Sequence, residues 1–401
     1  MLLKNCMIRV GQTLEKRDIL IEGMKIVKIE KEIDGVGLDL NNKYVCPSFT
    51  DLHVHFREPG FEAKETIKTG SLSAAKGGYT TVFLMPNLNP CPDCVENLKK
   101  EIEIIKKDAV IECIPYASVS KGEKGEDVSD IDNLKDYTRF FSDDGVGVNN
   151  IEVLDKALEK ISKYGLFIAS HAEDKVNSKL PEGEYRAVRR EIEHAIKYNS
   201  SYHFCHMSTR ESFEAIKNAQ DKGYKITCEV SPHHMFLNED MIKGNTNFKM
   251  NPPLRSEENR LETINALLNS VACCVATDHA PHTKEDKEKE YAKALNGIIG
   301  LETAAPLVYT NLVKTGKINY QQFEDFMTNN ARRLAGLKEN KIEVGYDANL
   351  AVLDINMPHT YQENEILSKG KNSPFIGYNL YGFNTLTIYN GKIVYETKGE
   401  I

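Results

Sequence analysis

Strand-length apolar runs alternate with helix-length amphipathic segments through the middle of the chain, and this alternation restricts the possible folds more than any other feature. Segments 149–165, 209–223 and 256–270, and segment 301–316 after the last strand, are predicted to be helices from their length and apolar pattern. Between such segments lie eight runs with the length of buried strands. They are YVCPSFTDLHVH, YTTVFLMPN, AVIECIPYA, TRFFSDDG, LFIASHAED, YHFCHMST, KITCEVSPHH and VACCVATDHAPH. The pattern predicts a parallel sheet covered by helices.

Eight β/α units favour a (β/α)8 TIM barrel, with an open doubly wound sheet as the alternative. The two ends of the chain differ from the middle, because both consist of short alternating runs separated by turns. Asn390-Gly391 near the end is a strong signal for a two-residue hairpin turn. We therefore predict a barrel domain over 47–340 and a small β-sandwich built from 1–46 and 341–401.

Composition narrows the class of protein. The chain has 401 residues, of which 41% are hydrophobic, so it can bury a sizeable core. A net charge of -8 disfavours nucleic acid as a partner and favours a small molecule. No apolar run is long enough to span a membrane and no secretory signal is evident, so we expect a cytoplasmic protein without membrane contact. The nine cysteines are expected to be reduced, and the lone pair Cys91 and Cys94 is interpreted as incidental.

Polar, chemically capable residues follow nearly every predicted strand. The carboxyl ends of barrel strands meet at one rim, where the active sites of such barrels are built. We therefore expect residues that are scattered along the chain to form a single pocket. The candidates are His53, His55, Asn87, Asp143, Asp144, His171, His206, His233, His234, Asp278, His279 and His282.

His53 and His55 form an H-x-H pair in the first barrel strand. Residues i and i+2 of a strand point to the same face, so both imidazoles can bind one metal ion. A pair of core histidines bonded to the backbone is the alternative. Further ligand types end other strands at the same rim, which favours the metal interpretation.

The later strands complete a set of ligands for two divalent ions. His171 and His206 each close an apolar run, and alone each is as well explained as a structural group. Together with the first pair they leave room for one carboxylate from the fourth strand, bridging the ions, and one from the eighth. Asp143 and Asp144 compete for the bridging position, and alternation directs only one of them inward. The pattern alone leaves that choice open.

Asp278 ends the most apolar strand, so its charge needs a metal or a hydrogen-bonding partner. Zinc lowers the pKa of bound water to about 7, and a neighbouring carboxylate can carry the released proton to a leaving nitrogen.

Arg57, Asn87 and Asn251 lie in loops that should reach the same rim. A guanidinium matches a carboxylate through two parallel hydrogen bonds, which suggests an anionic substrate, although each of these three residues is also explicable as a loop residue that bonds to backbone. His233 and His234 have no required place in the ligand set and are expected to lie behind it.

The motifs DLHVHFREPG, MPN, SDDG, SHAED, CHMST, KMNPPLR and ATDHAPHTKEDK, in this order, resemble those of class I dihydroorotases in the amidohydrolase superfamily. The resemblance covers nearly the whole chain. It implies a metal-dependent barrel that carries a small β-sandwich. It also implies interconversion of N-carbamoyl-L-aspartate and L-dihydroorotate, the ring-closing step of pyrimidine biosynthesis.

The resemblance also assigns roles to single residues. It implies one or two zinc ions per subunit, with Asp144 as the bridge if there are two, because in members of this type the bridging aspartate lies 27 positions before the histidine of strand five, as Asp144 does here. At Asn296-Gly297 the chain departs from the Phe-Gly or Pro-Phe-Gly of many relatives. The implied zinc ligands are His53, His55, Asp144, His171, His206 and Asp278, and the implied substrate contacts are Arg57, Asn87, Asn251, His282, Asn296 and Gly297.

Two alternatives to this function remain. One is another cyclic amidohydrolase, such as an allantoinase or a dihydropyrimidinase, but such enzymes normally carry a carboxylated lysine at the bridging position, and TRFFSDDG offers none. The other is a non-catalytic dihydroorotase-like partner of aspartate carbamoyltransferase. Such relatives lose metal ligands, whereas this chain keeps a full set. The resemblance leaves open a homo-oligomer and an association with aspartate carbamoyltransferase.

Overall fold

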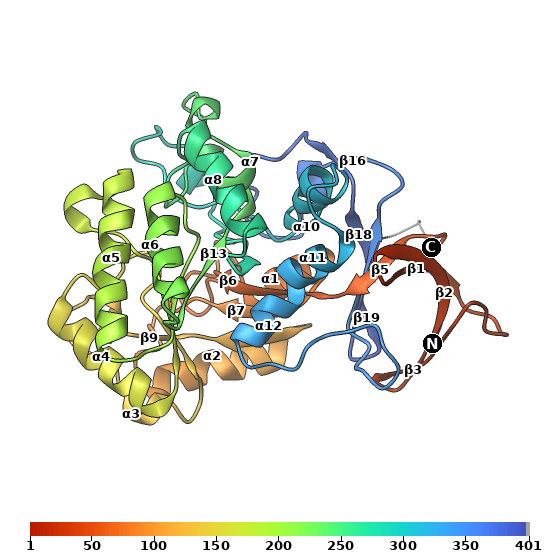
Figure 1. Cartoon of the computed structure of the whole chain (residues 1–401), viewed down its shortest axis with the longest axis horizontal. Coiled ribbons are helices and arrows are strands. Elements are labelled where there is room, and N and C mark those ends of the chain that lie inside the picture. The colour runs from red at the N-terminus through yellow and green to blue at the C-terminus, as the bar shows by residue number, and fades with distance from the viewer. Residues whose placement is uncertain (398–401) are drawn as a thin grey trace.

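The two ends of the chain build one sheet of eight strands, on the right of Figure 1. The computed structural model describes residues 1–397. The sheet has the order β19-β18-β15-β5-β1-β2-β3, with β4 paired to β1. Its strands are β1 (Leu2–Val10), β2 (Thr13–Glu22), β3 (Lys25–Glu30), β4 (Leu38–Asp39), β5 (Tyr44–Pro47), β15 (Leu350–Asp354), β18 (Phe383–Tyr389) and β19 (Lys392–Glu396).

This sheet curls around an apolar core of its own. The edge strand β3 meets the segment before β15, because Ile26 N–H donates to Tyr346 O at 3.0 Å. Buried side chains from both chain ends, among them Leu3 and Val352, fill the enclosed space. The predicted hairpin between β18 and β19 is confirmed: Asn390 and Gly391 both have positive φ, 50° and 74°, as a type I′ turn requires.

The middle of the chain forms a barrel of parallel strands. One ladder joins β6, β7 and β8, and a second joins β9 to β14 in order. β8 and β9 follow one another across Tyr116 and connect the ladders, and a parallel bridge between Val54 and His279 closes the ring. The TIM-barrel prediction is therefore confirmed. Its strands are β6 (Phe49–Val54), β7 (Tyr79–Leu84), β8 (Glu112–Pro115), β9 (Ala117–Ser118), β10 (Phe140–Ser142), β11 (Phe167–Ser170), β12 (Tyr202–Phe204), β13 (Ile226–Val230) and β14 (Cys274–Val275).

Amphipathic helices cover the barrel. In α4 the Asn150 side chain caps the first turn by accepting from Glu152 N–H, and Gly165 ends the helix with φ 61°. Its buried residues, such as Leu154 and Leu158, recur at helical spacing and face the barrel. The helices are α1 (Ile67–Lys76), α2 (Val95–Asp108), α3 (Ile131–Leu134), α4 (Ile151–Tyr164), α5 (Pro181–Lys197), α6 (Arg210–Asp221), α7 (Pro232–Phe236), α8 (Glu257–Leu268), α9 (Lys284–Lys287), α10 (Ala304–Val308), α11 (Tyr320–Glu324) and α12 (Asn330–Leu334).

Two details differ from the sequence-based expectation. The run 44–55 was predicted as one barrel strand, but the chain bends at Ser48, so β5 belongs to the end sheet and β6 to the barrel. The helix expected over 301–316 is α10 followed by a π-helical turn at Tyr309–Val313. Residues 361–378, which fall in the segment 341–401, include side chains that pack against the barrel. The domain boundaries 1–46, 47–340 and 341–401 stay a prediction.

None of the helices within residues 1–397 has the length and apolarity needed to cross a membrane.

Candidate active site

The structure brings all six predicted ligand residues together at the carboxyl ends of the barrel strands. His53 lies in β6, and the other five follow the last residues of β6, β10, β11, β12 and β14. All six side chains are buried. Because the strands are parallel, their carboxyl ends converge on one rim and place the side chains within contact of one another. The six are His53, His55, Asp144, His171, His206 and Asp278.

One group of ligand atoms surrounds a point between β6 and β14. His55 Nε2 lies 3.1 Å from Asp278 Oδ1, and His53 Nε2 lies 3.5 Å from the same oxygen. Asp144 Oδ2 approaches His53 Nε2 at 3.3 Å and His55 Nε2 at 3.4 Å. Two imidazoles and two carboxylates therefore present one atom each to a common centre.

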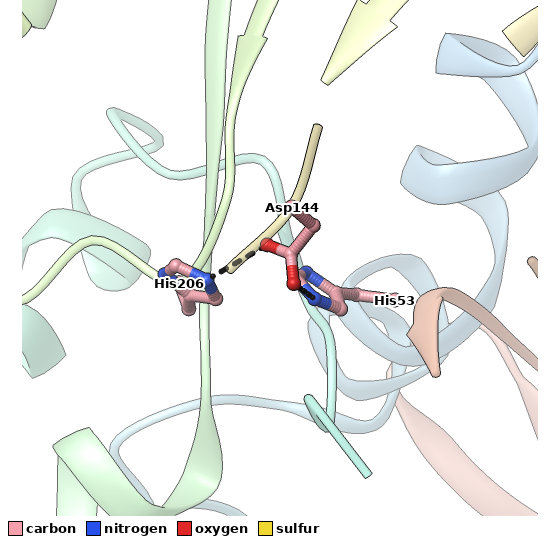
Figure 2. Close-up of side chains that lie close together, drawn as sticks. All are labelled: His53, Asp144 and His206. Carbon is pink, nitrogen blue, oxygen red and sulfur yellow. Dashed lines mark hydrogen bonds and ion pairs between the residues drawn. The ribbon is translucent and has the colours of Figure 1, made fainter. Parts of the chain in front are cut away.

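A second group lies on the other side of Asp144. Asp144 Oδ1 is 3.3 Å from His206 Nε2 and 3.7 Å from His171 Nδ1, and these two nitrogens are 3.1 Å apart. Figure 2 shows the Asp144 carboxylate between the rings of His53 and His206, with one oxygen directed to each. This is the geometry of a carboxylate that bridges two centres.

The choice between the two aspartates follows from their partners. Asp143 turns away from the rim and accepts hydrogen bonds from Val119 N–H at 2.7 Å, Ser120 N–H at 3.0 Å and the Ser120 hydroxyl. Burial raises the pKa of Asp143 to about 7. Burial opposes ionisation of Asp144 as well, but the histidines around it hold its pKa well below the usual range.

The donor set fits divalent metal ions. Imidazole nitrogens and carboxylate oxygens are the ligands of zinc and related ions, and two groups of these residues present atoms that lie within 4.8 Å of one another. His53 Nε2 is buried and has no hydrogen-bond partner among residues 1–397. His206 and Asp278 have positive φ, 38° and 48°, a costly conformation for such residues that is typical of functional sites.

A buried carboxylate holds His53 from behind, and sequence reasoning missed it. Glu229 in β13 pairs its Oε1 with His53 Nδ1 at 3.0 Å and its Oε2 with His203 Nε2 at 3.1 Å. Burial opposes the ionisation of Glu229, but these hydrogen bonds lower its pKa to about 2. An ionised Glu229 keeps the proton on His53 Nδ1 and leaves Nε2 free to bind metal. A charged residue inside an apolar strand was the signal that could have revealed this residue.

A cavity of about 320 Å³ opens over the candidate metal centre. All six predicted substrate contacts line it, together with three of the candidate metal ligands. The lining residues are His55, Arg57, Asn87, Asp144, Gly145, Val146, Asn251, Asp278, Ala280, His282, Leu295, Asn296 and Gly297.

Arg57 places an unpaired cation in this cavity. Its Nε is buried without a hydrogen-bond partner, and within residues 1–397 its guanidinium forms no ion pair. Burial lowers the pKa of Arg57, although its normal value is so high that the side chain stays charged. A partly buried guanidinium that lacks a carboxylate partner favours an anionic ligand.

Two asparagines border the ligand residues. Asn87 Nδ2 donates to Asp144 O at 2.6 Å and to Glu123 Oε1 at 2.9 Å, whereas the buried Asn87 Oδ1 has no hydrogen-bond partner in the described part of the chain. Asn251 Nδ2 lies 2.9 Å from His171 Nε2 and 3.2 Å from Glu173 Oε2. Sequence reasoning missed Glu123, which ends the short 3-10 helix Lys121–Glu123 and belongs to no recognised motif.

One wall of the cavity is formed by loop backbone. His282 Nε2 donates to Asn296 O at 2.6 Å. Gly297 has φ 133°, and a Cβ there would lie 2.8 Å from Ala280 Cβ, so only glycine fits. Asn372, which sequence reasoning also missed, accepts from His282 N–H at 3.1 Å and donates to Ala280 O and Gly297 O at 3.0 Å each. It comes from the segment that had been predicted as sandwich.

The remaining predicted positions lie outside this arrangement. His233 and His234 are buried in α7, and His234 Nε2 donates to Pro252 O at 2.9 Å, next to Asn251. Burial lowers the pKa of both histidines. All nine cysteines are free, including Cys91 and Cys94.

Comparison with known proteins identifies relatives over the full length. The family model described as Dihydro-orotase-like matches residues 42–199. A dihydroorotase of Fusobacterium nucleatum subsp. nucleatum is 42% identical over 100% of both chains. A dihydroorotase of Bacillus licheniformis is 39% identical over 95% of this chain and 94% of its own.

Solved structures support the fold. L-Hydantoinase (dihydropyrimidinase) from Arthrobacter aurescens matches with a TM-score of 0.89 at 24% identity, covering 98% of this chain and 96% of that chain. Dihydropyrimidinase from Brevibacillus agri matches with a TM-score of 0.87 at 22% identity, covering 99% and 95%. At this identity the likeness shows a common barrel architecture. The identity to the two curated relatives, which extends over at least 94% of each chain, shows more: this chain belongs to the dihydroorotase family.

Proposed function

We propose that this protein is a zinc-dependent dihydroorotase that interconverts N-carbamoyl-L-aspartate and L-dihydroorotate in pyrimidine biosynthesis. One observation carries the choice of substrate: the unpaired guanidinium of Arg57 lines the same cavity as His55, Asp144 and Asp278 of the candidate metal centre. Both proposed substrates carry an α-carboxylate that takes no part in the reaction and is free to pair with a guanidinium. The relatives at 42% and 39% identity are themselves named dihydroorotases.

Zinc is the metal we assign to the site, as one or two ions. His53, His55 and Asp278 would hold one ion, His171 and His206 the other, with Asp144 shared between them. When bound, such an ion polarises the substrate carbonyl and lowers the pKa of water to about 7. The chain's own residues then bind the substrate, orient it and move protons.

Arg57 would bind the substrate carboxylate through two parallel hydrogen bonds and thereby fix the orientation of the ring. Asn87, Asn251 and His282 lie around the same cavity and would complete the contacts. The backbone of Asn296-Gly297 forms the remaining wall, with Gly297 allowing the chain to approach closely.

Asp278 would move the proton. Burial opposes its ionisation, but the hydrogen bond from His55 and the neighbouring histidines lower its pKa, so the carboxylate is available as a base. In ring opening, a C–O bond forms at the ring amide carbon, the C–N bond breaks, and Asp278 transfers the proton from the attacking water to the departing nitrogen. In ring closure the same proton helps to expel water.

The test is ring opening of L-dihydroorotate by purified protein, compared with hydantoin, allantoin and dihydrouracil, with and without added zinc. We expect turnover of dihydroorotate only, loss of activity with a chelator and recovery with zinc. Faster turnover of a neutral ring would favour another cyclic amidohydrolase. Protein that contains no zinc and is not activated by zinc would favour a non-catalytic, dihydroorotase-like partner of aspartate carbamoyltransferase.

A homo-oligomer, an association with aspartate carbamoyltransferase and a cytoplasmic location stay predictions from the sequence. Size-exclusion chromatography with light scattering, on the protein alone and mixed with the carbamoyltransferase of the same organism, measures the first two. A mass equal to that of one 45.2 kDa chain in both samples would contradict both forms of assembly.

A further inference from the structure

Lys287 is a buried lysine whose ammonium group is surrounded by backbone carbonyls. The residue is 5% exposed. Its Nζ donates to Leu295 O and Gly297 O at 2.9 Å each and to Lys249 O at 3.2 Å. An ammonium has three N–H donors and no acceptor, so the three carbonyls satisfy it completely. Within residues 1–397 Lys287 forms no ion pair, so these carbonyls are what compensates the buried charge.

The three carbonyls belong to two segments that form one wall of the proposed substrate cavity. One segment, 249–251, ends at Asn251, and the other, 295–297, carries Asn296 and Gly297. Gly297 N–H also donates to Lys249 O at 3.0 Å. Because Asn296 O accepts from His282 Nε2, the position of this wall also fixes the His282 ring. Lys287 does not line the cavity itself. Its three hydrogen bonds hold the backbone that carries Asn251, Asn296 and Gly297, and through Asn296 O they also affect the position of His282.

Lys249 holds the same loop from its other side. Its Nζ donates to Tyr291 O and Ala294 O at 2.6 Å each and to Ala292 O at 3.0 Å. The segment 291–297 contains no helix or strand. The segment 291–297 is therefore held by two lysine ammonium groups, each of which donates to three backbone carbonyls, and not by the hydrogen bonds of a helix or a strand. Burial and the nearby Lys249 lower the pKa of Lys287 to about 8, so the charged form still predominates at neutral pH.

We propose that Lys287 is a positioning residue for substrate binding, which holds the 249–251 and 295–297 segments at the distance that the substrate requires. Lys249 supports it from outside. The proposal rests on the proposed function, because it concerns the wall of that cavity. It predicts that loss of Lys287 weakens substrate binding while the chemistry at the metal centre continues, since the ligand residues are held by barrel strands that Lys287 does not contact.

The test compares Lys287→Met with Lys284→Met in the full-length, zinc-loaded protein. Lys284 lies in the same helix and its side chain is 78% exposed. Within residues 1–397 its one ion pair is with Glu288, so its substitution removes the same charge without touching the loop. For Lys287→Met we expect the KM for L-dihydroorotate to rise about tenfold and kcat to stay within about threefold, as removal of hydrogen bonds to a charged group implies. Lys284→Met should change neither.

Amide hydrogen exchange of the substrate-free protein is a second measurement, which reports the order of the loop and does not depend on enzymatic turnover. Peptides covering 249–251 and 291–297 should exchange faster in Lys287→Met, whereas those covering β11 should not change. If the wild-type protein does not open dihydroorotate, the proposed function fails, and exchange still decides whether Lys287 orders the loop. Unchanged exchange together with an unchanged KM overturns the positioning role, as does a fall in kcat with KM unchanged.

Two further variants keep the proposal falsifiable if Lys287→Met does not fold. Lys249→Met removes the outer ammonium and should also raise KM. Lys287→Arg keeps the charge but changes the geometry, so its KM and loop exchange should lie between those of wild type and Lys287→Met. A purely structural lysine would lower the melting temperature in all of these variants and leave KM within twofold of wild type, and that result would refute the proposal.

Discussion

The two halves of the candidate pocket are held in different ways. The metal half consists of side chains at the ends of parallel strands, so the barrel itself sets their positions. The loop half, 249–251 and 295–297, is held by hydrogen bonds from Lys287 and Asn372 to its backbone carbonyls. Because they are held differently, the two halves should control different kinetic properties. Changes in the metal half should alter metal affinity and kcat, and changes in the loop half should alter KM.

Asp278→Asn tests the metal half most severely. Removal of a carboxylate that moves a proton should lower kcat by about 1000-fold, while substrate affinity stays measurable. Steady-state kinetics and metal analysis of the same samples separate loss of chemistry from loss of metal. Asp221→Asn, an exposed aspartate paired with Lys217 on α6, is the matched control and should behave as wild type. Retained turnover in Asp278→Asn would show that another group carries the proton.

Glu229→Gln addresses the support behind the metal half. Without a charged acceptor the His53 ring is less firmly held in the required tautomer, so metal affinity should fall by about 10- to 100-fold. A competition titration with a chelator measures it. With excess metal, KM should stay within about twofold of wild type.

Glu324→Gln is the control for that substitution. Glu324 is also a buried carboxylate, bonded to Arg9 and Tyr44 near the end sheet, so its loss reports general destabilisation. An equal loss of metal affinity in both variants would mean that Glu229 acts through overall stability alone.

Arg57 lines the cavity together with residues of both halves, and Arg57→Lys tests its contact with the substrate. Lysine keeps the charge but cannot form two parallel hydrogen bonds to a carboxylate, so the KM for L-dihydroorotate should rise about tenfold, with a smaller change in kcat. Kinetics in both directions of the reaction measure the effect, because both substrates carry the carboxylate. An unchanged KM would remove the main reason to prefer an anionic substrate over a neutral ring.

The same contrast explains what the sequence could reveal. Strand ends are recognisable because apolar runs stop at them, so the ligand candidates could be found before any coordinates. Alternation could not choose between Asp143 and Asp144, because β10 ends at Ser142 and both aspartates lie in the following turn. Hydrogen bonds from Val119 and Ser120 decide which of them turns away.

The loop half depends on contacts between distant segments, which local patterns do not encode. Asn372 binds His282 across 90 positions, and nothing around it distinguishes it from other loop asparagines. Lys287 appears in a run of charged residues that is typical of an exposed helix, yet it is buried. The barrel and most ligand candidates could therefore be predicted, whereas the residues that hold the loops could not.

Asn372→Ala should have the smallest effect, because Lys287 still holds the same loop from the other side. The variant leaves Ala280 O and the His282 N–H without this partner, which should cost about 1–3 kcal/mol of stability, and KM should rise about threefold with kcat unchanged. Urea unfolding and steady-state kinetics measure the two effects. Asn379→Ala, an exposed asparagine of the same terminal region, should change neither. If Asn372→Ala instead lowered kcat as strongly as Asp278→Asn, the loop would act on the reacting atoms, and the division of the pocket into two separately held halves would be wrong.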